Sequence, residues 1–177
     1  HPFAIYFSAN RVWDYALCGL LLSLCFCVAQ RLGEKHGWAA WFGFGLLYGL
    51  TALSNPAVLI TFPFLLILAL YHAGRTSRAA GPHLRRGMIA IIGVVVMILP
   101  WTIRNYRTMH ALCPVRDNFW LEFWSGNTGG TSSTMPAWTH PASSPVEMTK
   151  YLASGEIAYI AQKHVMAVEF VRQHPVR

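Results

Sequence analysis

Charged side chains are the scarcest component of this sequence of 177 residues. Asp, Glu, Lys and Arg together make up only 12% of it, against roughly 25% in soluble globular domains. Hydrophobic residues account for 54%, and the mean hydropathy is +0.37. This shortage of charge argues against a soluble domain and favours an all-α membrane protein whose helices cross the bilayer several times.

Cysteine is also scarce, and its spacing excludes two classes of protein. Three of the four cysteines lie within one apolar segment and the fourth stands alone: Cys18, Cys25, Cys27 and Cys113. Neither a disulfide framework nor a zinc motif has this pattern. The eight histidines are scattered without ligand spacing. We therefore predict no cofactor, although a divalent metal ion is compatible with the sequence.

Acidic residues are half as frequent as basic ones, which gives a formal net charge of +7. Such an excess can indicate nucleic-acid binding. Here four arginines fall in a single loop between apolar segments, and no basic, aromatic-bearing soluble module is present: Arg75, Arg78, Arg85 and Arg86. Cytoplasmic loops of membrane proteins collect Lys and Arg in this way. We therefore expect membrane lipid and no nucleic acid as a partner.

Long uncharged runs predict about four transmembrane helices. The run over 38–71 would be about 51 Å long as one helix, so we divide it at Ser54-Asn55-Pro56. Each half is short for a span, and a re-entrant pair is the alternative. Three glycines give the first half a small-residue face for helix packing: Gly43, Gly45 and Gly49. The predicted spans are 12–32, 38–53, 57–72 and 87–103.

Residues 87–99 carry no polar side chain, and Trp101, Arg104 and Arg107 follow them. This order is typical of a helix that leaves a bilayer at the headgroups. Placing the arginine-rich loop and the connection with Arg31 and Lys35 in the cytoplasm puts six basic residues inside, against Arg11 in the short outside segments. The sequence thus predicts a transmembrane region over 1–107 and an exoplasmic, mostly helical segment over 108–177.

The exoplasmic segment contains a polar cluster among aromatic side chains. Carboxylates and amides beside aromatic rings suit the hydroxyl groups and the apolar face of a sugar, although a loop packed on the membrane would have the same composition. The cluster consists of Arg116, Asp117, Asn118, Glu122 and Asn127 among Phe119, Trp120, Phe123 and Trp124.

Two helices are predicted in the rest of this segment. Ser144-Pro145 opens the first and Gly155 ends it, and apolar residues at helical spacing predict a second helix before Pro175.

Several segments occur in an order that resembles one family. They are RVWD at 11–14, GLTALSNP at 49–56, PWTIRNY at 100–106, PVRDNF at 114–119 with GN at 126–127, and FVRQHP at 170–175. The set resembles bacterial membrane glycosyltransferases of the GT-C superfamily, in the family-39-like branch. That branch includes relatives of protein O-mannosyltransferases and lipid A aminoarabinose transferases.

The resemblance implies transfer of a sugar from a polyprenyl-phosphate donor to an acceptor at the exoplasmic face of the bacterial inner membrane. The catalytic carboxylate of such enzymes lies in a first exoplasmic loop. We expect that loop to be outside this sequence, which reads as an internal fragment of a longer protein. The catalytic residue and the acceptor are therefore unassigned.

Topology places Arg104 and Arg107 where they could bind the donor phosphate, since a guanidinium can contact phosphate with two hydrogen bonds. The alternative is that both are interfacial anchors. Asp14 could pair with Arg11, and Asn55 could cap the turn, rather than bind ligand. The remaining substrate-binding candidates are Asn105, Arg116, Asp117, Asn118, Glu122 and Asn127.

Two other classes of protein compete with the transferase. A transporter or lipid-carrier flippase should carry polar residues in the middle of its spans, where this sequence has almost none. A membrane-anchored interaction module would instead use 108–177 to bind a protein.

The predicted topology has a direct test. Single cysteines at Ser77 and Ser132, in a variant without the native cysteines, should react with impermeant maleimide from opposite sides of the membrane. Ser77 should be protected in intact cells and Ser132 labelled. Labelling of both positions from outside would contradict the orientation and the exoplasmic placement of Arg104.

Overall fold

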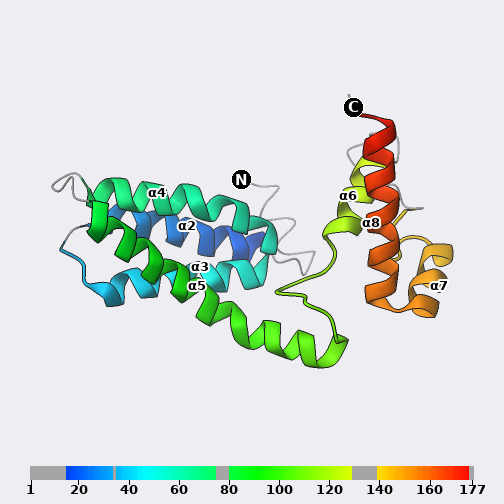
Figure 1. Cartoon of the computed structure of the whole chain (residues 1–177), viewed down its shortest axis with the longest axis horizontal. Coiled ribbons are helices and arrows are strands. Elements are labelled where there is room, and N and C mark those ends of the chain that lie inside the picture. The colour runs from blue at the N-terminus through cyan, green and yellow to red at the C-terminus, as the bar shows by residue number, and fades with distance from the viewer. Residues whose placement is uncertain (1–14, 34, 75–79, 129–138, 176–177) are drawn as a thin grey trace. The chain divides into compact units, whose positions relative to one another are not determined.

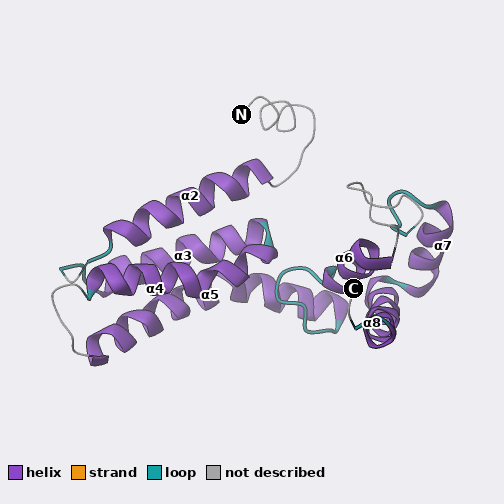
Figure 2. Cartoon of the chain, turned by 90° about the horizontal axis from the view of Figure 1, so that it is seen from above, coloured by secondary structure: helices purple, strands orange, loops and turns teal. Residues whose placement is uncertain are grey.

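The computed structural model describes residues 15–33, 35–74, 80–128 and 139–175. The chain separates into two compact units, 1–104 and 105–177, which we describe one at a time (Figure 1). Every regular element in the described ranges is a helix, and no strand occurs in them (Figure 2). The prediction of an all-α chain is confirmed.

The first unit is built from α2 (Tyr15–Arg31), α3 (Trp38–Ser54), the 3₁₀ helix η1 (Pro56–Thr61), α4 (Phe62–Ala73) and most of α5 (Ala80–Met109). The predicted break after Ser54 is confirmed. Asn55 is extended, with φ −148°, and its side-chain oxygen accepts a hydrogen bond from the Ala57 N–H at 3.0 Å. Pro56 follows at the first helical position, where its missing N–H breaks no hydrogen bond.

Backbones of α3 and α5 approach each other closely through glycine. A Cβ on Gly45 would lie 2.0 Å from the carbonyl oxygen of Ala90, and one on Gly93 would lie 2.5 Å from that of Phe42. Gly49 is similarly crowded by Met97, at 2.6 Å, whereas a Cβ on Gly43 would meet open space. The predicted small-residue face is therefore confirmed for Gly45 and Gly49, and the prediction is wrong for Gly43.

The buried core of this unit is apolar and lies where the four long helices face one another. Its largest members, Trp41, Phe44 and Tyr48, come from α3, and small side chains fill the space against the other helices. The core residues are Cys25, Ala29, Leu32, Trp41, Phe44, Tyr48, Ala69, Ala73, Ala90 and Val94.

Helix α5 is longer than the predicted span over 87–103. It is 30 residues long and continues through Pro100 and both arginines to Met109. Proline removes only one hydrogen bond of a helix and bends it, and the helix resumes on either side. His110, the residue after α5, has a left-handed φ of 51°, and its N–H donates to the Tyr106 carbonyl oxygen at 2.9 Å, which ends the helix.

In the described residues, two helical segments are long and apolar enough to cross a membrane, Pro56–Ala73 and Gly81–Met109. Only 11% and 22% of their apolar windows are buried, unlike a core helix of a soluble protein, which is mostly buried. α2 and α3 are apolar but have 17 residues each, so the predicted count of four spans is not confirmed. Large apolar side chains nevertheless cover the outer faces, among them Leu17, Leu20, Leu24, Ile60, Phe64, Ile67, Ile92, Val95 and Leu99.

The second unit contains α6 (Phe119–Thr128), α7 (Pro145–Ser154) and α8 (Glu156–Gln173). α7 begins as predicted, with the Ser144 hydroxyl accepting from the Glu147 N–H at 3.4 Å, and it ends at Gly155, whose φ is 77°. Both α6 and α7 pack against α8, around Tyr159 and Ile160. α6 spans the aromatic part of the predicted polar cluster, for which sequence analysis gave no helix bounds.

The crowding at Gly45 predicts a contrast between two alanine substitutions in α3. Gly45→Ala should lower stability by about 1–3 kcal/mol, because the new methyl group meets backbone that cannot move aside. Gly43→Ala should be neutral or slightly stabilising, since alanine is the better helix former. Unfolding in detergent, followed by circular dichroism, measures both. Equal stability of the two variants would contradict the close packing of α3 on α5.

Candidate functional site

The last turns of α5 carry two exposed arginines, Arg104 and Arg107. They are three residues apart, so both lie on one side of the helix. The Arg104 guanidinium carbon lies 4.7 Å from the centroid of the Trp101 ring, which orients the charge without burying it. Both cations sit near the negative end of the helix dipole, where positive charge is favoured. This part of α5 is able to bind an anionic group.

Asn105, between the two arginines, turns the other way and is buried. Its side-chain nitrogen donates hydrogen bonds to the carbonyl oxygens of Cys113, at 3.0 Å, and Val115, at 3.3 Å. These bonds fasten the segment after α5 to the end of that helix. The amide group serves the backbone, so its geometry does not favour substrate contact.

Several predicted sugar-binding residues meet at the start of α6. Asn118 accepts from the Glu122 N–H with its carbonyl oxygen, at 3.0 Å, and donates from its side chain to Glu122 Oε1, at 3.3 Å. Asp117 is half-buried, and this burial raises the pKa of its carboxyl group. Arg116 is exposed beside it.

Asn127 lies near the other end of α6, where its side chain is exposed and donates to the Phe123 carbonyl oxygen at 2.7 Å. The aromatic residues between these ends pack on one another and on α8. Trp120 stacks on His164 with ring centroids 4.0 Å apart. The structure thus brings Asp117, Asn118 and Glu122 together and leaves Asn127 apart from them.

The two remaining candidates differ in outcome. Asn55 is half-buried and caps η1, as the capping interpretation of this residue predicted. Asp14 and its suggested partner Arg11 lie outside the described residues.

A buried ionic network in the second unit was not anticipated as a site. Glu147 of α7 receives hydrogen bonds from Tyr159 Oη at 2.6 Å, Lys163 Nζ at 2.7 Å and Lys150 Nζ at 2.7 Å. Tyr159 and Lys163 are buried residues of α8. Their spacing of four residues was visible in the sequence. What sequence could not indicate was that α7 folds back so that Glu147 meets them.

Burial by itself raises the pKa of Glu147, but the hydrogen bonds from Lys150, Lys163 and Tyr159 outweigh burial and lower the pKa to about 2. Burial, followed by the hydrogen bond to the Glu147 carboxylate, raises the pKa of Tyr159. A carboxylate held this firmly in its charged form is a weak proton acceptor near neutral pH. The arrangement therefore holds α7 on α8 rather than supplying a general base.

No group of three or more His, Cys, Asp or Glu residues that could hold a metal ion occurs in the ranges that the structure describes. The polar residues near the end of α5 and at the start of α6 are arginines, amides and isolated carboxylates. They suit anion and hydroxyl recognition better than metal binding.

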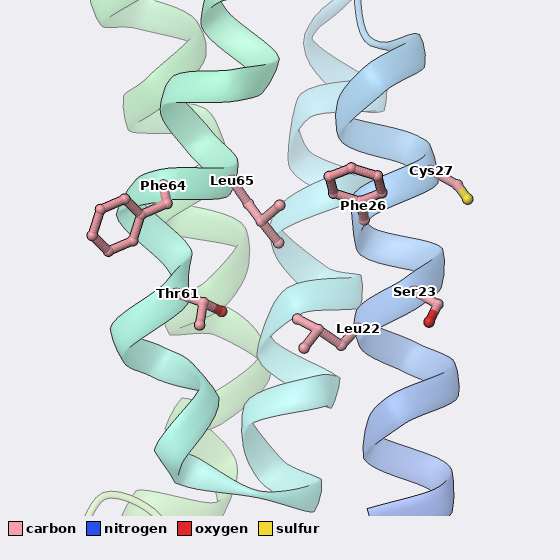
Figure 3. Close-up of a pocket in the computed structure, with 7 residues that line it drawn as sticks. All are labelled: Leu22, Ser23, Phe26, Cys27, Thr61, Phe64 and Leu65. Atoms are coloured by element: carbon pink, nitrogen blue, oxygen red, sulfur yellow. The ribbon is translucent and has the colours of Figure 1, made fainter. Parts of the chain in front are cut away.

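An apolar groove of about 540 Å³ lies between α2 on one side and η1 and α4 on the other in the first unit (Figure 3). Leu22 and Phe26 of α2 lie across it from Leu65 of α4. The Thr61 hydroxyl in its lining is hydrogen-bonded to Tyr48 Oη at 2.6 Å and to the Val58 carbonyl oxygen at 2.9 Å. Such a lining suits a hydrocarbon chain and offers nothing that would select a headgroup.

Comparison of the chain with protein-family models, with curated proteins and with solved structures finds no match.

The Glu147 network predicts acid-sensitive packing of α7. Because its folded-state pKa lies below the ordinary 4.5, this carboxylate should stabilise the fold above about pH 4.5 and lose that contribution as pH falls toward 2. Glu147→Gln should lower stability by about 3 kcal/mol near pH 7 and flatten the dependence below pH 5. Tryptophan fluorescence during denaturant unfolding measures both.

Glu169→Gln is the matched control for that variant. Glu169 is exposed on α8, and within the described residues it accepts a hydrogen bond from Gln173 at 2.7 Å, so its loss should change stability by less than about 0.5 kcal/mol. Equal losses of stability in the two variants would show that the buried network stabilises the fold no more than an exposed hydrogen bond does.

Proposed function

We propose that this chain is part of a multi-pass membrane glycosyltransferase, similar to the family-39-like branch of the GT-C superfamily. It would transfer a sugar from a polyprenyl-phosphate donor to an acceptor at the exoplasmic face of the bacterial inner membrane. The observation that carries the proposal is the pair Arg104 and Arg107, exposed on the last turns of a long apolar helix.

Membrane placement is supported by the outward side chains of the first unit. Exposing so many large apolar residues to water would be unfavourable by roughly 1.5–3 kcal/mol per side chain, whereas lipid accommodates them. α2 and α3, with 17 residues each, are about 26 Å long and lie at the lower limit for a span. We include them as the first two of four spans.

The chemistry explains why arginine should stand at the membrane surface. The acceptor's nucleophile attacks the anomeric carbon, and the bond from that carbon to the phosphate oxygen breaks. The lipid phosphate leaves with the electron pair and gains negative charge, which the two guanidinium groups stabilise. A carboxylate that removes the acceptor's proton has no assigned position here, and Asp117, Asn118 and Glu122 are proposed sugar contacts.

A transporter or flippase is the second candidate, and the interior of the first unit argues against it. Thr51 is the polar residue buried there among the described residues, and its hydroxyl donates to the Leu47 carbonyl oxygen at 2.9 Å. The charged residues that the structure describes in that unit lie near helix ends or in connections. A substrate pathway through the bilayer would require polar side chains along the spans.

The phosphate-binding role predicts a specific loss of activity. In the full-length protein, Arg104→Ala should reduce sugar transfer by roughly ten- to a hundredfold, as removal of a charge-assisted hydrogen bond does. Arg104→Lys should restore only part, because an ammonium group lacks the planar fork of a guanidinium. Transfer from a purified polyprenyl-phosphate sugar, in membranes with matched protein levels, is the measurement.

Arg172→Ala provides the control, since Arg172 is exposed on α8 and far along the chain from α5. It should leave transfer unchanged. Unaltered transfer by both Arg104→Ala and Arg107→Ala would refute the phosphate-binding role and leave these arginines as interfacial anchors.

A further inference from the structure

A second groove, of about 290 Å³, lies between α2 and α3. Its walls are apolar along most of its length, and its end at the α2–α3 connection carries Arg31 and His36. Groove and cation thus occur together within one unit, and no arginine of α5 lines the groove. The lining consists of Val28, Arg31, Leu32, His36, Ala40, Gly43, Phe44 and Leu47.

The charged end of this groove has the features of a membrane interface. Arg31 is the last residue of α2 and is exposed, Lys35 is exposed in the connection, and Trp38 opens α3 with 66% of its surface exposed. The His36 ring is fixed at the groove, because its Nδ1 accepts from the Gly33 N–H at 3.0 Å. Glu34, the acidic residue of this connection, lies outside the described residues.

Glycine keeps the groove open at its middle. Gly43 lines it, and a Cβ built there meets nothing within 4 Å. Gly45 on the same helix is crowded by α5, so its lack of a side chain is explained by packing. At Gly43 packing gives no such reason, and the missing side chain leaves space for something outside the protein.

We propose that this groove binds one anionic phospholipid. One acyl chain lies along Val28, Phe44 and Leu47, and the headgroup phosphate contacts the Arg31 guanidinium. The site is too small to enclose a whole lipid, so the rest of the molecule remains in the bilayer. This inference rests on the membrane placement in the proposed function, but it does not depend on sugar transfer.

Charge complementarity selects an anionic headgroup over a zwitterionic one. The described lining offers a guanidinium and an imidazole and no carboxylate. A phosphatidylglycerol phosphate gains a charge-assisted contact with Arg31, and basic pockets between transmembrane helices bind acidic lipids in this way. A choline headgroup would bring its own positive charge toward Arg31 and Lys35.

Native mass spectrometry of the full chain in detergent tests the site with two probes that share their acyl chains, dimyristoyl phosphatidylglycerol and dimyristoyl phosphatidylcholine. The unmodified protein should retain one phosphatidylglycerol with at least a roughly tenfold preference over phosphatidylcholine. Arg31→Gln should remove the preference. Arg85→Gln should keep it, because Arg85 is exposed near the start of α5 on the same predicted side of the membrane but outside the groove.

Two glycine variants test the acyl-chain part. Gly43→Phe should fill the groove and abolish retention of both lipids, while Gly19→Phe should leave retention unchanged. Gly19 is an exposed helical glycine whose Cβ also meets open space, and it does not line the groove. Circular dichroism confirms that both variants are helical. If Gly43→Phe does not fold, the Arg31→Gln comparison decides alone, since exposed Arg31 is not part of the core.

Equal retention of the two lipids by the unmodified protein would overturn the proposal, as would a Gly43→Phe variant that folds and retains phosphatidylglycerol like Gly19→Phe. The outcome is separable from that of the proposed transferase. A protein that retains phosphatidylglycerol through Arg31 but transfers no sugar supports this lipid site and contradicts the transferase. Arg104→Ala should leave lipid retention unaltered whether or not it lowers transfer.

Discussion

Contact between the backbones of α3 and α5 is the constraint on which the first unit depends. Gly45 and Gly93 allow the two helices to approach until a single added methyl group would overlap a carbonyl oxygen. In the proposed membrane setting there is little hydrophobic gain from helix association, so such close van der Waals packing would supply much of the attraction. It also holds α5, the helix that carries Arg104, against the core formed by Trp41, Phe44 and Tyr48.

Charge is distributed differently in the two units, for one physical reason. Moving an ion out of water is unfavourable unless partners replace its hydration. In the first unit Arg31, the last residue of α2, and Arg104, near the end of α5, avoid that cost by remaining exposed. In the second unit Glu147 is buried, and Lys163, Lys150 and Tyr159 replace its water. The two exposed arginines therefore keep contact with the surroundings of the protein, and the buried carboxylate is committed to structure.

The proposed transferase and the proposed lipid site use the same combination at different helix ends: an apolar surface that a hydrocarbon chain can follow, next to an exposed guanidinium. The α2–α4 groove shows that apolar space alone is less informative, because the polar atoms in its lining already have partners. Where a cation adjoins the apolar wall, the headgroup can be inferred from its charge.

Local sequence patterns determined several of the helical segments and where some of them end. The run over 38–71 is too long for one span and contains Asn55-Pro56, which caps and starts a new helix. Ser144-Pro145 likewise starts α7, and Gly155 ends it. The helix α6 was not visible in this way, because composition does not distinguish an aromatic loop from an aromatic helix. The full extent of α5 was not visible because Pro100 bends a helix without ending it, and the count of two long apolar helices depends on the observed helix lengths. Only tertiary structure decided that Gly45 packs against α5 and Gly43 does not. It also decided that Asn105 bonds the backbone after α5 while Arg104 is exposed, and that Glu147 meets Lys163. Those outcomes depend on which helix faces lie opposite each other, and residues far apart in the chain decide that together.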